Sequence, residues 1–427
     1  MKSLYIFLFA LLYGSLSGQY YFPPLAGNAW DTVNPSSLGW CSQKLDTVHK
    51  YLEARHSKSF IILHKGKIAD EIYMNGFAQD SAWYWASAGK TLAGFLTGMV
   101  QEDGLLNVND KTSDYLGTGW TLEPQAKEDL ITIRHQLSMT SGLDYNISDL
   151  NCLEDTCLKY LHDAGNHWYY HNAPYRLVQD VLENASGKNM NTLTYQKLGS
   201  TIGLAGLWYD YVFYSKARNM ARFGLLNLNK GNWAGTTILQ DSTYLYDMVH
   251  PSQNLNEAYG YLWWLNGQSS YRRPGLDIVF PGFMVPEAPA DMYMAAGKND
   301  QRIYVIPSMD LVVVRQGEAA YTSQLALSTF DNELWELLMD VFCQTTALHE
   351  SEIVDLQVYP NPASGFVNIS SSFELKSVQL ISLQGEVVKR QKKEFSKLNI
   401  QDVAAGVYFL QFETLAGESF QRKLVVK

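Results

Sequence analysis

The change of sequence character near residue 350 is the feature that most constrains how this chain can fold. Before it, the chain is rich in Trp, Tyr and Gly, and helical patterns alternate with short apolar runs. After it, short runs of alternating polarity are separated by turn residues at Gly385, Gly406 and Gly417. Strands at that spacing predict a small β-sandwich. We therefore expect a large mixed domain followed by an all-β module, and 427 residues suffice for both.

The first residues predict export. Lys2 precedes the apolar run 4–12, and small residues follow at Ser15 and Ser17. This layout is typical of a secretory signal peptide, cleaved after Ser17 or Gly18, and the run is too short to span a bilayer. An N-terminal membrane anchor is the alternative, but no stop-transfer pattern follows. The predicted segments are a signal peptide (1–18), a first domain (19–347), a linker (348–356) and a β-sandwich (357–427).

The four cysteines of an exported chain favour disulfides over metal sites. They lack the paired Cys/His spacing that zinc needs. Cys152 and Cys157 are close enough to close a small loop, and Cys41 and Cys343 then remain as a long-range pair. The net charge of −10, with no basic run in the first domain, argues against nucleic-acid binding. We expect no metal, no organic cofactor and a monomer.

The strongest catalytic signal is Ser87-Ala-Gly-Lys90, where an aromatic strand-like segment gives way to an amphipathic helix. A serine and a lysine three residues apart at a helix start lie on one face, so the amine can reach the hydroxyl. Burial, a nearby cation or the helix end would lower the pKa of the lysine and make it a base. The alternative is an N-cap serine with a solvated lysine. A phosphate-binding loop ending at Gly89-Lys90-Thr91 fails, because Tyr84 stands where that motif needs glycine.

The second element is Tyr170-His171-Asn172, just before a helical stretch. A tyrosine can exchange protons with the reacting group if nearby cations depress its pKa, and Asn172 can donate to a substrate. The same pattern occurs at Tyr73-Met74-Asn75. We prefer the later copy because it begins a helix from a loop. A packing role is the default alternative for such a tyrosine.

The third element is the stretch from Ala295 to Gln301, followed by two apolar runs around Pro307 that predict a hairpin. Gly297, at the edge of the first hairpin strand, would let a substrate carbonyl approach the backbone. The alternative for this segment alone is a core hairpin with a bulge.

In this order the three elements resemble the serine hydrolase family of class C β-lactamases, D-alanyl-D-alanine peptidases and their esterase and 6-aminohexanoate-dimer hydrolase relatives. The sequence resembles this family from about residue 38 to residue 345. The resemblance implies an α+β fold: an antiparallel sheet flanked by helices, a helical subdomain, and a site between them. It also implies first and last helices packed side by side, where Cys41 and Cys343 could meet.

The resemblance also assigns roles to single residues. Ser87 becomes the acyl-accepting nucleophile, Lys90 its activating partner, Tyr170 the proton carrier and Asn172 a substrate-orienting donor. The backbone N–H groups of Ser87 and Lys298 would form the oxyanion hole beside Gly297. One departure matters, because the Lys-Thr-Gly or His-Thr-Gly of the lactamases and peptidases is here Ala-Ala-Gly-Lys-Asn-Asp-Gln. The side chains that would hold a β-lactam carboxylate are absent, and the Gly-x-x-x-Gln form looks more like the amide and ester hydrolase branch.

The C-terminal module carries Val358-Tyr-Pro-Asn-Pro-Ala363, then Ala405-Gly-Val-Tyr408 and the basic-apolar end 422–427. This ordered set resembles the C-terminal sorting domain of the type IX secretion system. It implies export through the periplasm and the outer membrane, contact with that machinery, and release or surface attachment. The alternative is a generic β-sandwich that binds carbohydrate or packs on the enzyme.

The sequence thus predicts a secreted serine hydrolase that acts through an acyl-Ser87 intermediate on a small amide, ester or short peptide. The rival hypothesis is a non-catalytic surface protein of the same fold that binds cell-wall peptide or glycan.

Overall fold

The computed structural model of the chain describes residues 20–321, 327–343, 356–371, 374–382, 387–414 and 419–427. The predicted signal peptide lies outside the described residues, and so does the predicted linker except for Leu356. The chain divides into two compact units, Met1–Gln344 and Thr345–Lys427. Among the residues described, no helix is long and apolar enough to cross a bilayer.

The N-terminal unit is built on a six-stranded antiparallel sheet in the order β2-β1-β13-β12-β11-β8. Its strands are β1 Ser57–His64, β2 Lys67–Tyr73, β8 Trp264–Leu265, β11 Tyr293–Gly297, β12 Gln301–Ile306 and β13 Leu311–Gly317. β12 and β13 form the predicted hairpin around Pro307. Gly297 ends β11, a strand that pairs with β12, so its predicted place in the first hairpin strand is wrong by one strand.

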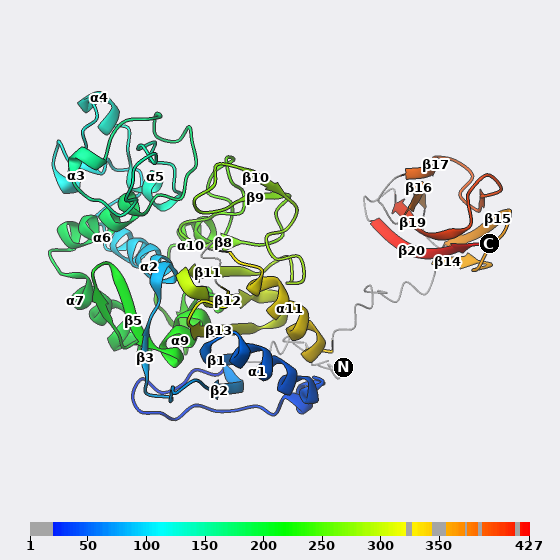
Figure 1. The fold of residues 1–427 in the computed structure, drawn as a ribbon, viewed down its shortest axis with the longest axis horizontal. Coiled ribbons are helices and arrows are strands. Elements are labelled where there is room, and N and C mark those ends of the chain that lie inside the picture. The colour runs from blue at the N-terminus through cyan, green and yellow to red at the C-terminus, as the bar shows by residue number, and fades with distance from the viewer. Residues whose placement is uncertain (1–19, 322–326, 344–355, 372–373, 383–386, 415–418) are drawn as a thin grey trace, which may run out of the picture. The chain divides into compact units, whose positions relative to one another are not determined.

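Helices cover both faces of this sheet (Figure 1). Successive side chains of a strand point to opposite faces. In β12, Ile303 faces α9, because a Cβ built on Gly224 of that helix would lie 3.0 Å from it. The next residue, Tyr304, faces α11 and donates a 2.6 Å hydrogen bond to Asp331. The helices of this unit are α1 Leu45–Ala54, α2 Gly89–Glu102, α3 Ser113–Leu116, α4 Gln125–Glu128, α5 Ile133–Leu137, α6 Asn172–Ser186, α7 Met190–Thr194, α8 Ser200–Ile202, α9 Ala217–Leu228, α10 Ser242–Met248 and α11 Phe330–Val341.

Helix α2 lies between the sheet and the helical part of the unit (Figure 1). It contacts β11 and α6, and its residues from Gly89 to Val100 are all buried. A small sheet in the order β3-β5-β4 leads into it. The shorter strands are β3 Ala82–Tyr84, β4 Leu207–Tyr209, β5 Val212–Lys216, β6 Asn232–Trp233, β7 Thr236–Thr237, β9 Ser270–Arg272 and β10 Val279–Pro281. The implied fold, an antiparallel sheet with flanking helices and a helical subdomain, is therefore confirmed.

Disulfides join the cysteines in the predicted pairs. Cys41 bonds to Cys343 with a Cα–Cα distance of 5.5 Å, and Cys152 bonds to Cys157 at 6.0 Å. The long-range bond is possible because α1 and α11 pack together. The backbone N–H of Cys41 donates to the carbonyl oxygen of Val341 at 2.8 Å. The bond therefore joins the beginning and the end of the folded N-terminal unit.

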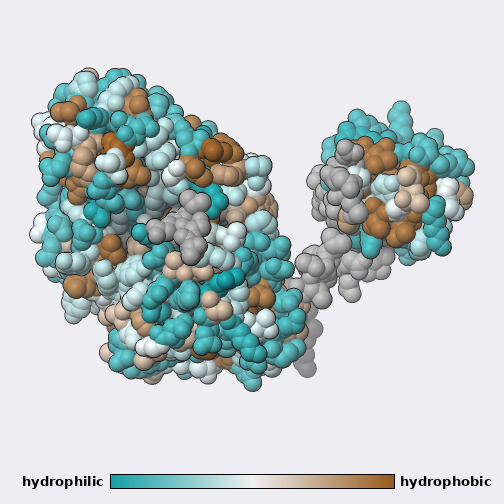
Figure 2. Space-filling view, viewed as in Figure 1, coloured by the Kyte–Doolittle hydropathy of each residue, from teal (hydrophilic) through white to brown (hydrophobic). Residues whose placement is uncertain are grey.

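The C-terminal unit contains two antiparallel sheets around one apolar core. Their orders are β14-β15-β18 and β17-β16-β19-β20. The strands are β14 Leu356–Tyr359, β15 Phe366–Ser371, β16 Leu375–Ser382, β17 Val387–Gln391, β18 Lys397–Asn399, β19 Gly406–Thr414 and β20 Ser419–Val426. Val367 from one sheet and Leu380, Leu410 and Leu424 from the other are fully buried in this core. Figure 2 shows apolar surface near the middle of the visible face of this unit, with a hydrophilic rim.

Candidate active site

The backbone that carries Ser87 is held by a buried tryptophan. Ser87 lies in a short 3-10 turn, Ala86–Ala88, between β3 and α2. The preceding Trp85 is 0% exposed, and its backbone N–H and its indole Nε1 donate 2.8 Å bonds to Phe213 and Ser215. Ala86 has a positive φ of 48°, a conformation that costs a non-glycine residue about 1 kcal/mol or more. The fixed Trp85 and the strained Ala86 together set the position of Ser87, which is partly exposed.

Lys90 lies one helical turn beyond Ser87 and points back toward it. Its Nζ donates to the Ser87 Oγ at 3.2 Å, as expected for residues three apart on one helix face. Its side chain is buried, and aromatic rings form much of its surroundings. The Nζ atom lies 4.0 Å from the ring centre of Tyr175 and 5.4 Å from that of Tyr170. The predicted convergence of the amine and the hydroxyl is therefore present.

The surroundings of Lys90 favour its neutral form. Burial holds the pKa of this amine well below its usual value, and the nearby positive charge of Arg176 lowers it further. In the part of the chain that the structure describes, no carboxylate forms an ion pair with Lys90. An amine whose pKa is lowered in this way can accept a proton from serine near neutral pH.

Tyr170 stands immediately before α6 and beside the same amine. It is 7% exposed, and its ring stacks on Trp264 with 5.7 Å between centroids. Burial raises the pKa of its phenol, and the hydrogen-bonding Ser87 side chain only partly offsets that shift. Proton exchange by this tyrosine was predicted for the case that nearby cations depress its pKa, whereas the pKa is raised. Tyr170 is therefore a neutral phenol at pH 7, able to donate a proton.

The two Tyr-x-Asn copies have different surroundings. Asn172 occupies the first turn of α6, and its buried Oδ1 has no hydrogen-bond partner among the described residues. In the earlier copy, the Tyr73 hydroxyl donates to Glu71, and Asn75 donates to the carbonyl oxygen of Ser57. The later copy is thus the one beside Lys90, while the earlier copy is tied into the edge of the sheet.

Gly297 allows β11 to pack directly on the serine-bearing turn. A Cβ built at this position would lie 2.3 Å from the carbonyl oxygen of Trp85 and 3.0 Å from the backbone nitrogen of Ala88. Its φ is −121°, an ordinary extended value, so the glycine is needed for space and not for conformation. From the sequence, this glycine was predicted to let a substrate carbonyl approach the backbone. In the structure the close neighbour is the protein's own backbone.

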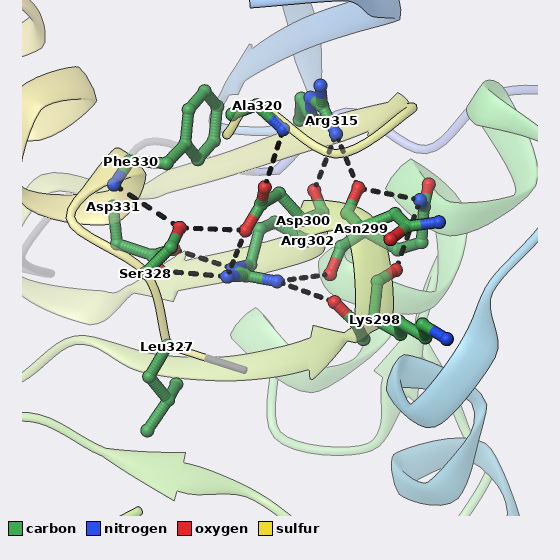
Figure 3. Close-up of polar contacts among 12 residues, drawn as sticks. Lys298, Asn299, Asp300, Arg302, Arg315, Ala320, Leu327, Ser328, Phe330 and Asp331 are labelled. Atoms are coloured by element: carbon green, nitrogen blue, oxygen red, sulfur yellow. Dashed lines mark hydrogen bonds and ion pairs between the residues drawn. The ribbon is translucent and has the colours of Figure 1, made fainter. Parts of the chain in front are cut away.

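The segment after Gly297 is held by a network of buried ions (Figure 3). Arg302 makes two hydrogen bonds to Asp331, at 2.6 and 2.8 Å, and one to Asp300 at 3.0 Å. It also donates to the carbonyl oxygen of Gly297 at 2.8 Å. Lys298 is exposed at the other end of this segment. The backbone beside Ser87 is thereby tied to α11 through a fully buried guanidinium.

Gln301 supports the same segment. It is 0% exposed, and its amide nitrogen donates to the carbonyl oxygens of Asn299 and Gly317 at 2.9 and 2.6 Å. Its Oε1 accepts the backbone N–H of Gly317 at 3.1 Å. This glutamine, prominent in the Gly-x-x-x-Gln pattern, therefore holds the loop.

Several of these supporting residues were not identified from the sequence. Tyr175 lies one turn beyond Asn172 on α6, so helical spacing could have suggested that it faces the site. Arg302 and Asp331 are far apart in the chain, and no motif joins them. No cluster of three or more metal-ligating side chains occurs in the described ranges.

Comparison with protein families gives two matches on separate parts of the chain. The beta-lactamase family model matches residues 46–316, and the model of the secretion system C-terminal sorting domain matches residues 357–427. The second region is also 32% identical, over 71 residues, to beta-agarase D of Zobellia galactanivorans. The aligned part is 17% of this chain and only 15% of the agarase, so it covers a small part of that protein.

Solved structures resemble the N-terminal unit at low sequence identity. A Bacillus anthracis protein provisionally assigned as a 6-aminohexanoate-dimer hydrolase matches 76% of this chain and 86% of its own, with a TM-score of 0.53 and 16% identity. A penicillin-binding protein homologue from Caulobacter crescentus matches 70% of this chain and 98% of its own, with a TM-score of 0.53 and 12% identity. At these identities the likeness concerns the fold alone.

Proposed function

The chain belongs to the beta-lactamase family, and from this premise we propose that it is a serine hydrolase acting through an acyl-Ser87 intermediate on a small amide, ester or short peptide. The observation that carries the proposal is the 3.2 Å contact between the Ser87 hydroxyl and a buried Lys90 amine. A lysine used only for packing or for surface charge gains nothing from pointing at a serine in a site that disfavours its charge.

The pKa shifts of Lys90 and Tyr170 suggest different roles for the two groups. The lowered pKa of Lys90 makes it the base, and the raised pKa of Tyr170 keeps its phenol protonated. Two neighbouring groups whose surroundings shift their proton affinities in opposite directions are typical of an acid and base pair. The proposal therefore assigns activation of serine to Lys90 and delivery of a proton to the leaving group to Tyr170.

The proposed reaction has two steps. In the first, the Ser87 proton passes to the Lys90 amine while Oγ bonds to the substrate carbonyl carbon. The bond to the leaving nitrogen or oxygen then breaks, and that atom takes up a proton through Tyr170, which is reprotonated by the Lys90 ammonium. In the second, a water molecule gives a proton to the Lys90 amine and attacks the ester carbonyl. The bond to Oγ then breaks, the acid leaves, and the Lys90 ammonium returns the proton to Oγ, which restores Ser87 and the neutral amine.

The backbone on both sides of the serine would stabilise the transition state. The N–H groups of Ser87 and Lys298 would donate to the developing oxyanion. Support for this part of the proposal is the tight packing of Gly297 on the turn, which leaves little freedom between the two segments. Asn172, with its unpartnered Oδ1, would orient the substrate.

We further propose that amides and esters are better substrates than β-lactams. Ala295-Ala-Gly297 stands in place of the Lys-Thr-Gly or His-Thr-Gly of the lactamases and peptidases, so the side chains that would hold a β-lactam carboxylate are absent. Trp264 and Tyr259 are buried and pack against Tyr170, so the wall behind the site is aromatic. An uncharged acyl group suits such a wall better than an anionic one, because burying a charge without a partner is costly.

The C-terminal unit determines where this activity is found. The sorting domain at residues 357–427 marks the protein as exported by the type IX system, to the cell surface or the medium. We propose that this unit contacts the outer-membrane secretion machinery, and that the N-terminal unit acts as a monomer after export.

A fluorophosphonate probe tests the proposal, because an activated serine displaces its fluoride and keeps the label. We expect the wild-type protein to be labelled on Ser87, and Ser87→Ala and Lys90→Met to lose the label. Side-by-side assays with p-nitrophenyl esters, short amides and a chromogenic cephalosporin should favour the first two. A folded wild-type protein that takes no label and hydrolyses none of these compounds would support the non-catalytic binding protein instead.

A further inference from the structure

One cavity of the N-terminal unit lies away from Ser87. It has a volume of about 770 Å³ and is lined by the C-terminal end of α9, by α10, by β8 and by the beginning of β11. Tyr293, the first residue of β11, lines the cavity, while Gly297, the last, packs beside Ser87. The two places are thus at opposite ends of one strand. The volume lies within the range typical of small-molecule sites.

The cavity lining combines neutral polar groups with apolar ones. Amide and hydroxyl side chains come from Asn227, Gln240, Ser242 and Gln268. Leu239 and other aliphatic residues line a further part of the wall. Such a lining suits an uncharged ligand that has many hydroxyl groups and one apolar face.

One polar atom of this lining is buried without a partner. Asn227 is 4% exposed, and its Nδ2 donates to the carbonyl oxygen of Phe223 at 2.7 Å. Its Oδ1 has no hydrogen-bond partner among the described residues. An unsatisfied buried acceptor costs about 1–3 kcal/mol, and Asn227 lines the cavity, so a ligand hydroxyl that reached this atom would remove that cost.

An aromatic pair forms a second part of the lining. The rings of Tyr246 and His250 stack with centroids 3.6 Å apart and planes 12° apart, and Tyr246 is 59% exposed. One face of the Tyr246 ring is covered by His250. The exposed ring face carries negative charge density, and it attracts the weakly positive C–H groups on the flat face of a pyranose.

The charged groups of the cavity do not favour an ionic ligand. Asp291 accepts the backbone N–H of Ser308 at 2.6 Å and its hydroxyl at 2.8 Å, so its carboxylate is already satisfied by neutral donors. Lys230 is the other charged lining residue, and the two are of opposite sign. The lining therefore gives little net attraction to an anion or a cation.

We propose that this cavity binds a short neutral oligosaccharide. The Asn227 Oδ1 would accept from a sugar hydroxyl, and the Tyr246 ring would stack on a sugar face at the rim. This binding does not depend on the proposed hydrolase activity. On an exported protein such a site would hold the enzyme near polysaccharide while Ser87 remains available at the other end of β11.

The test uses the full-length secreted protein and isothermal titration with maltohexaose, laminarihexaose, cellohexaose and agarohexaose. We expect at least one of these to bind, and Tyr246→Ala and Asn227→Leu each to weaken its binding by about tenfold or more. Tyr246 is largely exposed, so its variant remains informative if Asn227→Leu fails to fold. Tyr209→Ala, at a 70% exposed tyrosine outside the cavity, is the matched control and should bind normally.

Ser87→Ala separates this proposal from the first one. It should bind the sugar as the wild-type protein does, whether or not the enzyme is a hydrolase. The inference is overturned if none of the four sugars binds, if binding is unchanged in both Tyr246→Ala and Asn227→Leu, or if binding is lost in Ser87→Ala.

Discussion

Two buried cations in the N-terminal unit have opposite surroundings. Arg302 contacts two carboxylates, Asp331 and Asp300. Although burial alone lowers the pKa of Arg302, the two aspartates more than offset this, and its pKa is raised. Lys90 lies among aromatic rings, and its pKa is lowered. The charge of Arg302 is therefore stabilised by its surroundings, and the charge of Lys90 is disfavoured by them.

This contrast shows how rigidity and reactivity are separated within one site. A paired guanidinium fixes geometry, because its planar donors hold several acceptors in place at once. A buried lysine without a carboxylate partner destabilises the fold, but its lowered proton affinity suits a catalytic base. Arg302 holds the backbone of Gly297, which packs on the Ser87 turn, and Lys90 contacts the Ser87 hydroxyl itself.

Replacing Lys90 removes the cation with the lowered pKa, and this change has the largest expected effect. In Lys90→Met we expect kcat/KM to fall by about 10⁴-fold, because Ser87 loses its base. The same variant should melt a few degrees higher than the wild-type protein, since methionine fills the site without a polar group. Hydrolysis of the best ester substrate and a thermal melt measure the two effects.

Lys44→Met is the matched control for this change. Lys44 is an exposed lysine paired with Asp340, so its replacement should alter activity little and stability by less than about 1 kcal/mol. Near-normal activity in Lys90→Met would contradict the role of the amine as base.

Replacing Arg302 removes the ion pairs of the other buried cation and should lower mainly the stability of the protein. In Arg302→Met the carboxylates of Asp331 and Asp300 remain buried without their cation, and the expected loss is about 3–5 kcal/mol. Urea unfolding of the wild type and the variant measures it. A loss below about 1 kcal/mol would show that the network is solvated and does not hold the segment after Gly297.

The sequence predicted those features of the site and the fold that depend on residues close together along the chain. Ser87 and Lys90 are one helical turn apart, and Tyr170 and Asn172 flank the start of one helix, so local spacing suffices to place them. The two apolar runs around Pro307 likewise predicted the hairpin of β12 and β13. The amphipathic pattern after Ser87 also predicted a helix there, and that helix is α2, Gly89–Glu102.

The parts that depend on long-range packing could not be predicted in this way. The pairing of Arg302 with Asp331 joins a strand to a helix, and neither residue lies in a recognisable motif. The sign of the Tyr170 pKa shift depends on burial against Trp264, which no local pattern encodes. The reason for Gly297 also required the position of Trp85 in space.

Gly297→Ala tests whether the two sides of the site must remain in close contact. The added methyl would overlap the Trp85 carbonyl, so we expect a loss of about 1–3 kcal/mol in stability. Displacement of Ser87 by a few tenths of an ångström should also lower kcat, by about 10- to 100-fold. Gly406→Ala is the control, because its Cβ would approach only the side chain of Tyr408, at 3.4 Å. Equal activity in both variants would contradict close packing as a requirement.

The smallest expected effect concerns the dependence of stability on pH. The pKa of Lys90 is lower in the folded protein than its ordinary value of 10.5. Between these two values the unfolded chain binds more protons than the folded one, so the free energy of unfolding rises with pH. One such group contributes at most about 1.4 kcal/mol per pH unit. Arg302 contributes nothing here, because its raised pKa keeps it charged in both states.

Urea unfolding at pH 7, 8 and 9 therefore separates the two cations. The difference in stability between the wild type and Lys90→Met should shrink as pH rises, because the wild type regains the free energy that neutralising the buried amine costs at lower pH. The difference between the wild type and Arg302→Met should stay constant over the same range. Parallel curves for the wild type and Lys90→Met would mean that the amine keeps the same proton affinity in both states, and the assignment of Lys90 as base would lose its electrostatic support.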